Sequence, residues 1–388
     1  MPERSSHRAD SDRDGLSAPA APARHHDSAG RHPDHEVYPR RRGGLGDNTG
    51  SDRQPRVYSP WLLVRYTPTD NGVGRPVPGN AVFWVSPDIW VESSDPLGNA
   101  VLGQQNIVHA RVFNLGKAQS SPTRVDFYWG DAAVGLGPGQ MNFIASETVV
   151  VPFHRSKDVR VKWVPTSTGH ECLMVNTTCD INDPIAQPFQ PTLDRHVAQR
   201  NISVVQAGAG ETVKFQVGVN NLAPMMATIT VAARLEHLAV RRNATAAMPH
   251  RDVVSHVANH VRGERADIVR DIADESRFDR SAPRIRGQLS EASSIVPSRN
   301  GRSFFAHMLL GSDQRAALAS RRDTSRDIAL VEAMMRGFEH RALDLELGIP
   351  GNAGPGEFVV FHVSQAIAGL QVGGYTIVVE IPGTIGDG

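Results

Sequence analysis

The stretch that decides the fold spans residues 86–180 and contains six short runs with strand character: DIWVE at 88–92, NIVHARVFN at 106–114, TRVDFYW at 123–129, NFIASETVVVP at 142–152, DVRVKWVP at 158–165 and HECLMVN at 170–176. Apolar side chains recur at every second position of these runs, as at Val108, Ala110 and Val112. A period of two is typical of a strand with one buried face. The pattern predicts a β-sandwich.

Length and charge limit what the whole chain can be. Its 388 residues with 40% hydrophobic content suffice for two domains plus segments that belong to neither. The 41 basic and 41 acidic residues give a formal net charge of zero, so no global field draws the chain to nucleic acid or to an anionic membrane. No apolar run approaches the roughly 20 residues of a membrane helix. We therefore expect neither nucleic-acid binding nor membrane insertion.

The N-terminal segment, residues 1–56, has almost no branched apolar residues and shows neither period, which predicts a disordered tail. Met1 is followed by PERSSHRADSDRDG rather than by a signal peptide. The default expectation is a cytoplasmic protein, with non-classical export as the alternative. The tail also offers loose metal ligands and a basic run for an acidic partner, although a solvated tail explains them equally: His7, His25, His26, His32, His35 and the three Arg residues at 40–42.

A second unit of the same plan follows the first. FQVGVNNLAP at 215–224 and ATITVAARL at 227–235 repeat the pattern of a strand, an Asn-containing turn and a further strand seen at 106–129. The late strand at 168–175 has an expected counterpart at 373–381, GGYTIVVEI. Asn114 and either Asn220 or Asn221 are predicted at the equivalent turns, because Asn bonds its own loop.

The predicted fold is therefore mainly β, with two tandem immunoglobulin-like sandwiches. A Pro- and Gly-rich lead-in covers 57–85, the first sandwich 86–200 and the second 201–388. Within the second, residues 239–342 lose the alternation and gain helical spacing. Two amphipathic helices are expected there, one at 253–275 and one beginning near 324, as a largely helical insertion between two strands.

The motifs of the first unit carry a resemblance. VHARVFNLGKAQSSPTRVDFYWG at 108–130 and the Trp163 to Pro165 turn with its Gly-led strand resemble the bacterial cell-adhesion-related family, called CARDB, over about residues 86–180. The resemblance implies an immunoglobulin-like β-sandwich. It also implies a role in adhesion, spacing or protein contact.

Two groups of residues have metal-ligand character. His256, His260 and Glu264 recur every four residues and would share one face of a helix. Asp180, Asn182 and Asp183 follow a strand, where they could hold calcium or could cap a turn. The polar face of a charged helix explains the first group equally well, so we assign no metal site and no cofactor.

No catalytic motif is present: the chain has no G-x-S-x-G, no P-loop and no dinucleotide fingerprint. We therefore expect no enzymatic activity and assign no catalytic residue. Cys172 is expected in the core and Cys179 at a strand end, without a bridge between them. Trp84 and Trp90 are expected to plug the end of the sandwich, with a ligand platform as the alternative.

The sequence favours a non-enzymatic interaction, adhesion or scaffold module with a protein partner. Strand edges or the apolar face of the expected insertion would make the contact, the latter through Val257, Val261, Met334 and Phe338. The first alternative is an accessory module of a hydrolase or a larger particle that binds carbohydrate or an assembly through Trp84, Trp90 or Trp129. The second is a metal-dependent activity in the insertion.

Overall fold

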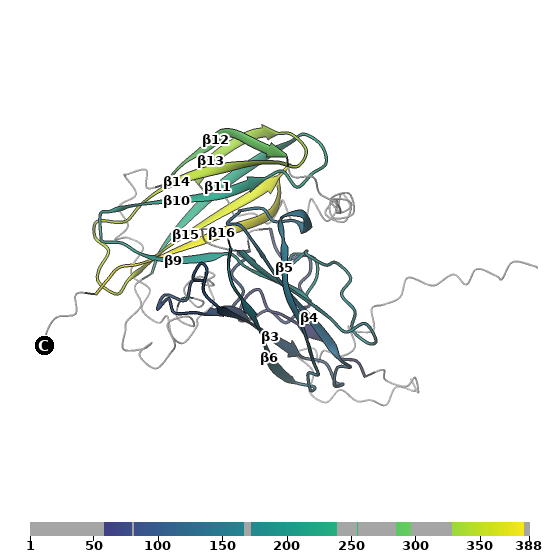
Figure 1. Cartoon of the computed structure of the whole chain (residues 1–388). Coiled ribbons are helices and arrows are strands. Elements are labelled where there is room, and N and C mark those ends of the chain that lie inside the picture. Colours follow the sequence, from purple (N-terminus) through teal and green to yellow (C-terminus); the bar gives the residue numbers. More distant parts are fainter. Residues whose placement is uncertain are drawn as a thin grey trace, which may run out of the picture.

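The computed structural model describes residues 58–79, 81–166, 172–238, 254, 285–295 and 328–383. These residues form four β-sheets, paired face to face as two sandwiches (Figure 1). The expected mainly β architecture is confirmed. Within the described residues, no helix has the length and apolar character needed to cross a membrane.

The first sandwich has eight strands. In one sheet, the central strand β3 (Asn106–Asn114) pairs with three others: β1 (Leu62–Leu63), β2 (Ile89–Glu92) and β6 (Arg155–Trp163). The facing sheet has the order β5-β4-β7-β8: β4 (Thr123–Gly130), β5 (Asn142–Val149), β7 (Cys172–Thr178) and β8 (Val197–Arg200). Val108 lies opposite both Val91 and Val161, and the inward side chains of both sheets fill one core. The short β1 of the lead-in is fully buried against β3.

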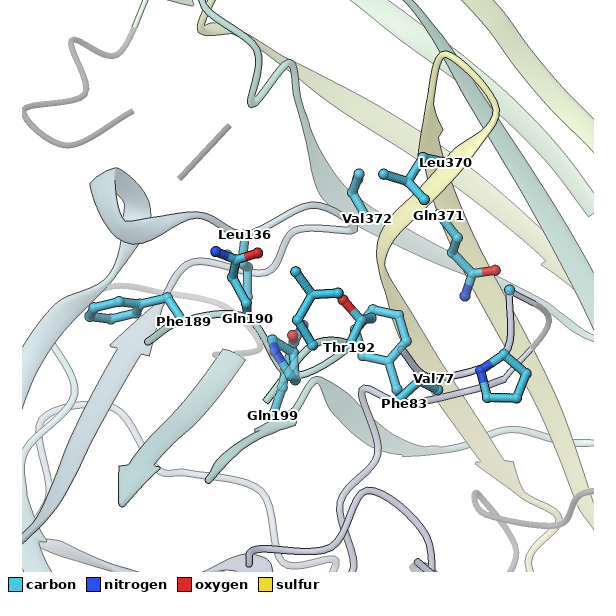
Figure 2. Close-up of a pocket in the computed structure, with 14 residues that line it drawn as sticks. Val77, Phe83, Leu136, Phe189, Gln190, Thr192, Gln199, Leu370, Gln371 and Val372 are labelled. Atoms are coloured by element: carbon cyan, nitrogen blue, oxygen red, sulfur yellow. The ribbon is translucent and has the colours of Figure 1, made fainter. Parts of the chain in front are cut away.

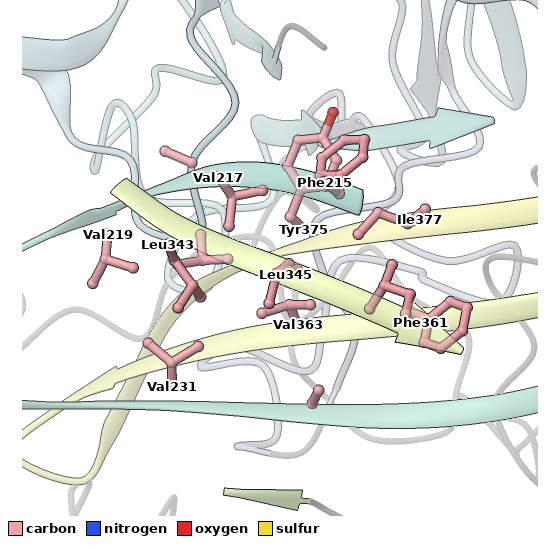
Figure 3. Packing of buried hydrophobic residues seen from close by; sticks show 14 of the residues in the cluster. Phe215, Val217, Val219, Val231, Leu343, Leu345, Phe361, Val363, Tyr375 and Ile377 are labelled. Carbon is pink, nitrogen blue, oxygen red and sulfur yellow. The ribbon is translucent and has the colours of Figure 1, made fainter. Parts of the chain in front are cut away.

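The second sandwich also has eight strands. Its smaller sheet has the order β10-β14-β12: β10 (Thr212–Asn220), β12 (Ile285–Ile295) and β14 (Glu339–Gly348). The larger has the order β13-β11-β15-β16-β9: β9 (Ile202–Gln206), β11 (Ala227–Leu238), β13 (Ile328–Met335), β15 (Phe358–Ile367) and β16 (Leu370–Glu380). Figure 3 shows Phe215 and Leu345 of one sheet packing with Phe361, Val363 and Tyr375 of the other.

The helix expected near residue 324 is wrong where the structure describes it, because 328–348 forms strands β13 and β14. β13 pairs with β11 from Met335 opposite Ala227 to Ile328 opposite Ala233. Met335 is fully buried while its neighbour Met334 is 57% exposed, which is strand alternation. A short apolar run such as IALVEAMM satisfies both periods, and the ladder offered by β11 decides between them.

Of the rest of the expected insertion, the structure describes one part as a strand and leaves most of the other part outside the described residues. Residues 285–295, which fall between the two expected helices, form β12 along β14. The other expected helix, at 253–275, lies outside the described residues except for Val254, which is buried in a cluster with Trp84 and Phe358. Residues 239–342 therefore contain β12, β13 and the start of β14, and they contribute to both sheets of the second sandwich.

The internal repeat is visible in two equivalent asparagine turns. Asn114 Oδ1 accepts from Gly116 N at 3.0 Å, and its Nδ2 donates to Ala118 O at 2.8 Å. Asn221 makes the same pair of bonds two and four residues onward, at 2.9 Å each. Both amides also donate across to a hairpin of the same unit, at Val151 O and Met335 O respectively.

The expected equivalence of the strands at 168–175 and 373–381 is off by one strand. In the first unit β7 lies beside β4, and in the second the strand beside β11 on the side away from β13 is β15, not β16. The Gly-led apolar segment at 373–381 instead pairs with β15 and, in parallel, with β9. Apolar strands of similar length resemble one another, so sequence pattern alone does not distinguish neighbours in a sheet.

A loop of the first sandwich extends a sheet of the second. In the loop between β4 and β5, Val134 N donates to Gly218 O at 2.9 Å, and Gly218 N donates to Ala132 O at 2.7 Å. Asn220 Nδ2 donates to Gly135 O at 2.6 Å. The edge of β10 is therefore occupied by the first sandwich, and the two sandwiches share one continuous apolar cluster.

Trp84 makes a second contact that joins the two sandwiches. Its indole is 2% exposed, lies in a cluster with residues of both sandwiches, and donates from Nε1 to Thr376 Oγ1 at 3.0 Å. Gly374 lies directly beneath the ring, where any Cβ would overlap it. Trp84 therefore packs between the sandwiches rather than at the end of one.

We expect Gly374→Ala to lower the free energy of unfolding by about 1–3 kcal/mol, because the added methyl group forces the buried Trp84 ring to move. Urea denaturation followed by tryptophan fluorescence measures this change. Gly351→Ala is the matched control, since a Cβ there meets nothing within 4 Å. An equal effect of the two substitutions would contradict the close packing of Trp84.

We expect Asn221→Ala to lower the free energy of unfolding by about 3 kcal/mol, because it leaves a buried N–H and buried carbonyls without their partner. The control is Asn142→Ala on the exposed side of β5, where a change within about 0.5 kcal/mol is expected. Thermal and urea unfolding would test both variants. A neutral Asn221→Ala would show that the repeated turn does not stabilise the second unit.

Candidate functional site

The first metal candidate and the N-terminal candidates lie outside the described residues. This applies to His256, His260 and Glu264, to the His residues of the tail and to the Arg run at 40–42. Among the residues that are described, no group of three His, Cys, Asp or Glu side chains could hold a metal ion.

The second metal candidate is a turn after β7. Asp180 Oδ1 accepts from Thr178 Oγ1 at 2.8 Å, and Asn182 Oδ1 accepts from Cys179 Sγ at 2.7 Å. Asp183 is buried and points the other way, accepting from Leu62 N at 2.6 Å. Asp180 and Asn182 therefore accept from local donors, as in turn capping, whereas Asp183 accepts from the lead-in.

The tryptophans offered no open platform. Trp90 is 7% exposed and stacks on His109, with ring centroids 4.8 Å apart. Trp129 packs against Trp163 at 6.0 Å beside the first core. Trp84 and Trp90 are therefore buried, whereas Trp129 is half-buried.

A buried charge cluster lies beside the turn. His196 is 2% exposed and lies between Asp194, at 2.7 Å from Nδ1, and Asp183, at 3.2 Å from Nε2. Arg195 also pairs with Asp183, and its guanidinium lies 3.8 Å from the centroid of the Trp61 ring. Because Asp183 also holds the backbone of Leu62, this cluster fastens the lead-in to the first sandwich.

The two acids set the protonation of His196. Burial alone would lower its pKa, but hydrogen bonds to Asp183 and Asp194, with the charge of Asp183, outweigh burial and raise the pKa of His196. For Asp194, burial acts to raise the pKa, and the hydrogen bond and charge of His196 outweigh it, so the pKa falls well below its usual range. The folded protein therefore favours His196 charged and Asp194 ionised.

A pocket lies where the two sandwiches and the lead-in meet, and we call it the junction pocket (Figure 2). Phe83 comes from the lead-in, Leu136 from the β4–β5 loop, and Leu370 and Val372 from β16. The loop before β8 adds Phe189, which has a positive φ of 62°. The cavity volume is about 40 Å³, and the cavity is partly open to solvent.

Two amide groups in the wall of the junction pocket have unused hydrogen-bonding atoms. Gln190 and Gln199 are 4% and 2% exposed. Within the described part of the chain, Gln190 Oε1 accepts no hydrogen bond and Gln199 Nε2 donates none. Buried amide atoms are rarely left without a partner, but both atoms are themselves buried, so the pocket wall does not present them to an occupant.

Sequence reasoning missed both glutamines. Gln199 lies in β8 and Gln190 in a loop between Phe189 and Pro191, and neither sits in a motif or a charged cluster. Their proximity depends on how a loop returns to its own sheet, which composition and period do not encode.

Among solved structures, the chain is similar to the CARDB domain of the PF1109 protein from Pyrococcus furiosus, in complex with di-metal ions. That match covers 37% of this chain and 92% of the domain, at 13% identity and a TM-score of 0.23. A solution structure of the same domain matches 30% of this chain and 94% of its own, at 20% identity and a TM-score of 0.21. The CARDB resemblance stated from the sequence is therefore also found in structure, over about a third of the chain.

A family 123 glycoside hydrolase from Clostridium perfringens matches 47% of this chain and 23% of its own, at 7% identity and a TM-score of 0.24. No family model and no curated protein matches the chain. At these identities and TM-scores, the structural matches carry no argument about function.

The charge cluster predicts a pH dependence. In the unfolded chain the pKa of His196 is about 6.5, and in the folded protein it is higher. Charged His196 therefore adds its full share to the free energy of unfolding below about pH 6.5, and this share is lost as the pH rises through the pKa of the folded state. The pKa of Asp194 is lower in the folded protein than its value of about 3.9 in the unfolded chain. Ionised Asp194 therefore stabilises the fold above about pH 3.9, and this stabilisation is lost as the pH falls toward the pKa of the folded state. We therefore expect the cluster to contribute most between about pH 4 and 6.5.

Urea unfolding of the wild type and of His196→Gln at several pH values tests this. The difference in free energy of unfolding between the two proteins should be largest near about pH 5 and should shrink at alkaline pH, where the folded wild type also loses the imidazolium. A difference that stays constant with pH would contradict the assignment of a charged His196.

Proposed function

We propose that the chain is a non-enzymatic protein-interaction module of CARDB-like, tandem immunoglobulin-like sandwiches, which binds an extended segment of a partner protein along the edge of β13. The two sandwiches act as one rigid frame. The observation that carries the proposal is the contrast between strand edges that the chain covers itself and the edge of β13.

Two strand edges of the second sandwich, those of β10 and β9, are covered by other parts of the same chain. The β4–β5 loop pairs with β10 through Gly218. Beyond β9, Asn99 takes the place of a neighbouring strand, because its Oδ1 accepts from Val204 N at 3.0 Å and its Nδ2 donates to Val204 O at 2.9 Å. Exposed edges invite pairing with other chains, and the side facing the first sandwich is closed to it.

The edge of β13 differs. Among the described strands it pairs only with β11, and it lies on the side of the second sandwich away from the first (Figure 1). Met334 on β13 is 57% exposed, and Met225 and Met226 in the turn before β11 are 61% and 60% exposed. Met334 contacts Thr228, the second residue of β11, through its sulfur. We call these three methionines the methionine edge.

The chemistry of the methionine edge fits a peptide. A free strand edge offers backbone donors and acceptors that an added strand satisfies, and side chains beside it select the sequence. Thioether side chains are flexible and polarisable, so they adapt to varied apolar partners. Met334 was expected on the apolar face of a helix, and the proposal keeps it as a contact residue on a strand.

The two alternatives have less support. Carbohydrate binding would depend on Trp84 and Trp90, which are buried, or on Trp129, which is half-buried against Trp163. A metal-dependent activity would depend on His256, His260 and Glu264, which lie outside the described residues.

To test the proposal, the full chain and a triple variant, Met225→Ser, Met226→Ser and Met334→Thr, would be used to capture proteins from the lysate and medium of the source organism. We expect a captured partner to bind the variant at least about tenfold more weakly, because apolar contact area is lost from the interface. Hydrogen exchange with the purified partner should protect the amides of β13.

The matched control is Phe143→Ser with Phe153→Ser, since both side chains are 58% exposed on the first sandwich. This control should bind the partner as the wild type does. Loss of binding in the control with retention in the methionine variant would move the interface to β5. Capture of no protein by the wild type from either source would overturn the proposal.

A further inference from the structure

Glu332 lies near the middle of β13, and its side chain is exposed. It shares a face of the sheet with Met334, because side chains two residues apart in a strand point the same way. Across the ladder it is opposite Thr230 of β11, which carries no charge. Within the described part of the chain, no hydrogen bond or ion pair engages the Glu332 carboxylate. The edge of β13 therefore presents one negative charge beside one thioether.

The backbone of β13 offers its hydrogen-bonding groups at the same two positions. On the next strand, Thr228 faces β15, because its carbonyl oxygen accepts from Ala368 N at 3.1 Å. Directly opposed residues of an antiparallel pair point their N–H and C=O groups either at each other or both away. Met334 is opposite Thr228, so Met334, and Glu332 two residues earlier, point these groups away from β11. A strand added at this edge is held at the residues that carry the charge and the thioether.

A second copy of the chain is a poor occupant of this edge. Because Glu332 is near the middle of β13, antiparallel pairing of two β13 strands over most of their length brings the two Glu332 side chains opposite or diagonal to each other. Their separation would be about 5 Å when opposite and about 7–8 Å when diagonal, and like charges directly opposite destabilise a strand pair. Charged side chains on edge strands commonly prevent self-pairing in this way.

The same charge favours a partner strand that carries a basic residue. Opposite charges that face each other across a strand pair stabilise it, and the aliphatic stem of Lys or Arg can lie along the neighbouring Met334. Arg336, which follows β13, is also exposed. A basic residue is therefore favoured at the Glu332 end of the bound segment and not at the other end.

We propose that the charge of Glu332 determines which segments bind at the edge of β13. The bound segment carries Lys or Arg opposite Glu332 and an apolar residue, two positions away, opposite Met334. The same charge excludes a second copy of this chain. The inference rests on the proposed function, because it specifies the partner of the same edge.

Selection from a library of short random peptides displayed on phage, with the full chain as the target, tests the preference. We expect the wild type to enrich peptides with Lys or Arg two positions from an apolar residue. Glu332→Lys should enrich Asp or Glu at that position instead. In synthetic copies of the selected peptides, Gln in place of the basic residue should weaken binding to the wild type about threefold, and Glu about tenfold, because attraction is lost and then replaced by repulsion.

The matched control is Glu147→Lys, since Glu147 is an exposed glutamate on β5, an edge strand of the first sandwich. This control should enrich the same peptides as the wild type. Glu332→Gln keeps the shape of the side chain without its charge, so it should bind the Lys and Gln peptides within about twofold of each other. Urea unfolding of each variant verifies that the exposed substitutions leave the fold intact.

Hydrogen exchange at increasing protein concentration tests the exclusion of a second copy. In the wild type, the amides of Glu332 and Met334 should exchange at a rate that does not depend on concentration. In Glu332→Val, which removes the repulsion and adds a β-branched side chain, both amides should become protected as the concentration rises. Concentration-dependent protection of these amides in the wild type would overturn the exclusion.

The outcomes separate this inference from the proposed function. Peptides that the wild type enriches and the triple methionine variant does not, but that lack a preferred basic residue, would overturn the role of Glu332 and leave the edge of β13 as a binding site. Enrichment of the same basic peptides by Glu332→Lys would have the same meaning. If the wild type enriches no peptide, both the inference and the proposed edge are wrong.

Discussion

The structure depends on one close approach of backbones, in which the β4–β5 loop lies along β10. Residues 132–135 complete the sheet of another sandwich, and Gly218 exchanges two backbone hydrogen bonds with them. A Cβ at Gly373 would meet Val134 O, and one at Gly374 would meet Trp84, so glycine on β16 is required twice at the same junction. Together with the packing of Trp84, these contacts hold the two sandwiches against each other, and the junction pocket lies where they meet.

The charge cluster has a related role at the other end of the lead-in. Asp183 holds Leu62 N, and Arg195 packs on Trp61, so the segment that delivers Trp84 is fixed before it reaches the junction. A buried ion pair of this kind gains little net free energy after desolvation. Its contribution is to place a segment with little secondary structure of its own.

The sequence predicted the strands where burial alternates, as in β3 and β6, and it predicted the asparagine turns because their side chains bond locally. It misassigned 328–342 because IALVEAMM fits both periods and its partner β11 lies about a hundred residues earlier in the chain. The junction pocket was not predictable, since Gln190 and Gln199 carry no motif and meet only through tertiary packing. The CARDB resemblance indicated a fold, and it does not extend to these residues.

A single residue, Asn201, separates β8 of the first sandwich from β9 of the second, and its backbone bonds to Trp84 and Thr376. The connection therefore has no slack. β9 runs parallel to the last strand, β16, so tension between the first sandwich and the C-terminal end loads their hydrogen bonds in shear. Bonds loaded in shear share the load and must break together, so this one-residue connection leads into a mechanically resistant pair of strands.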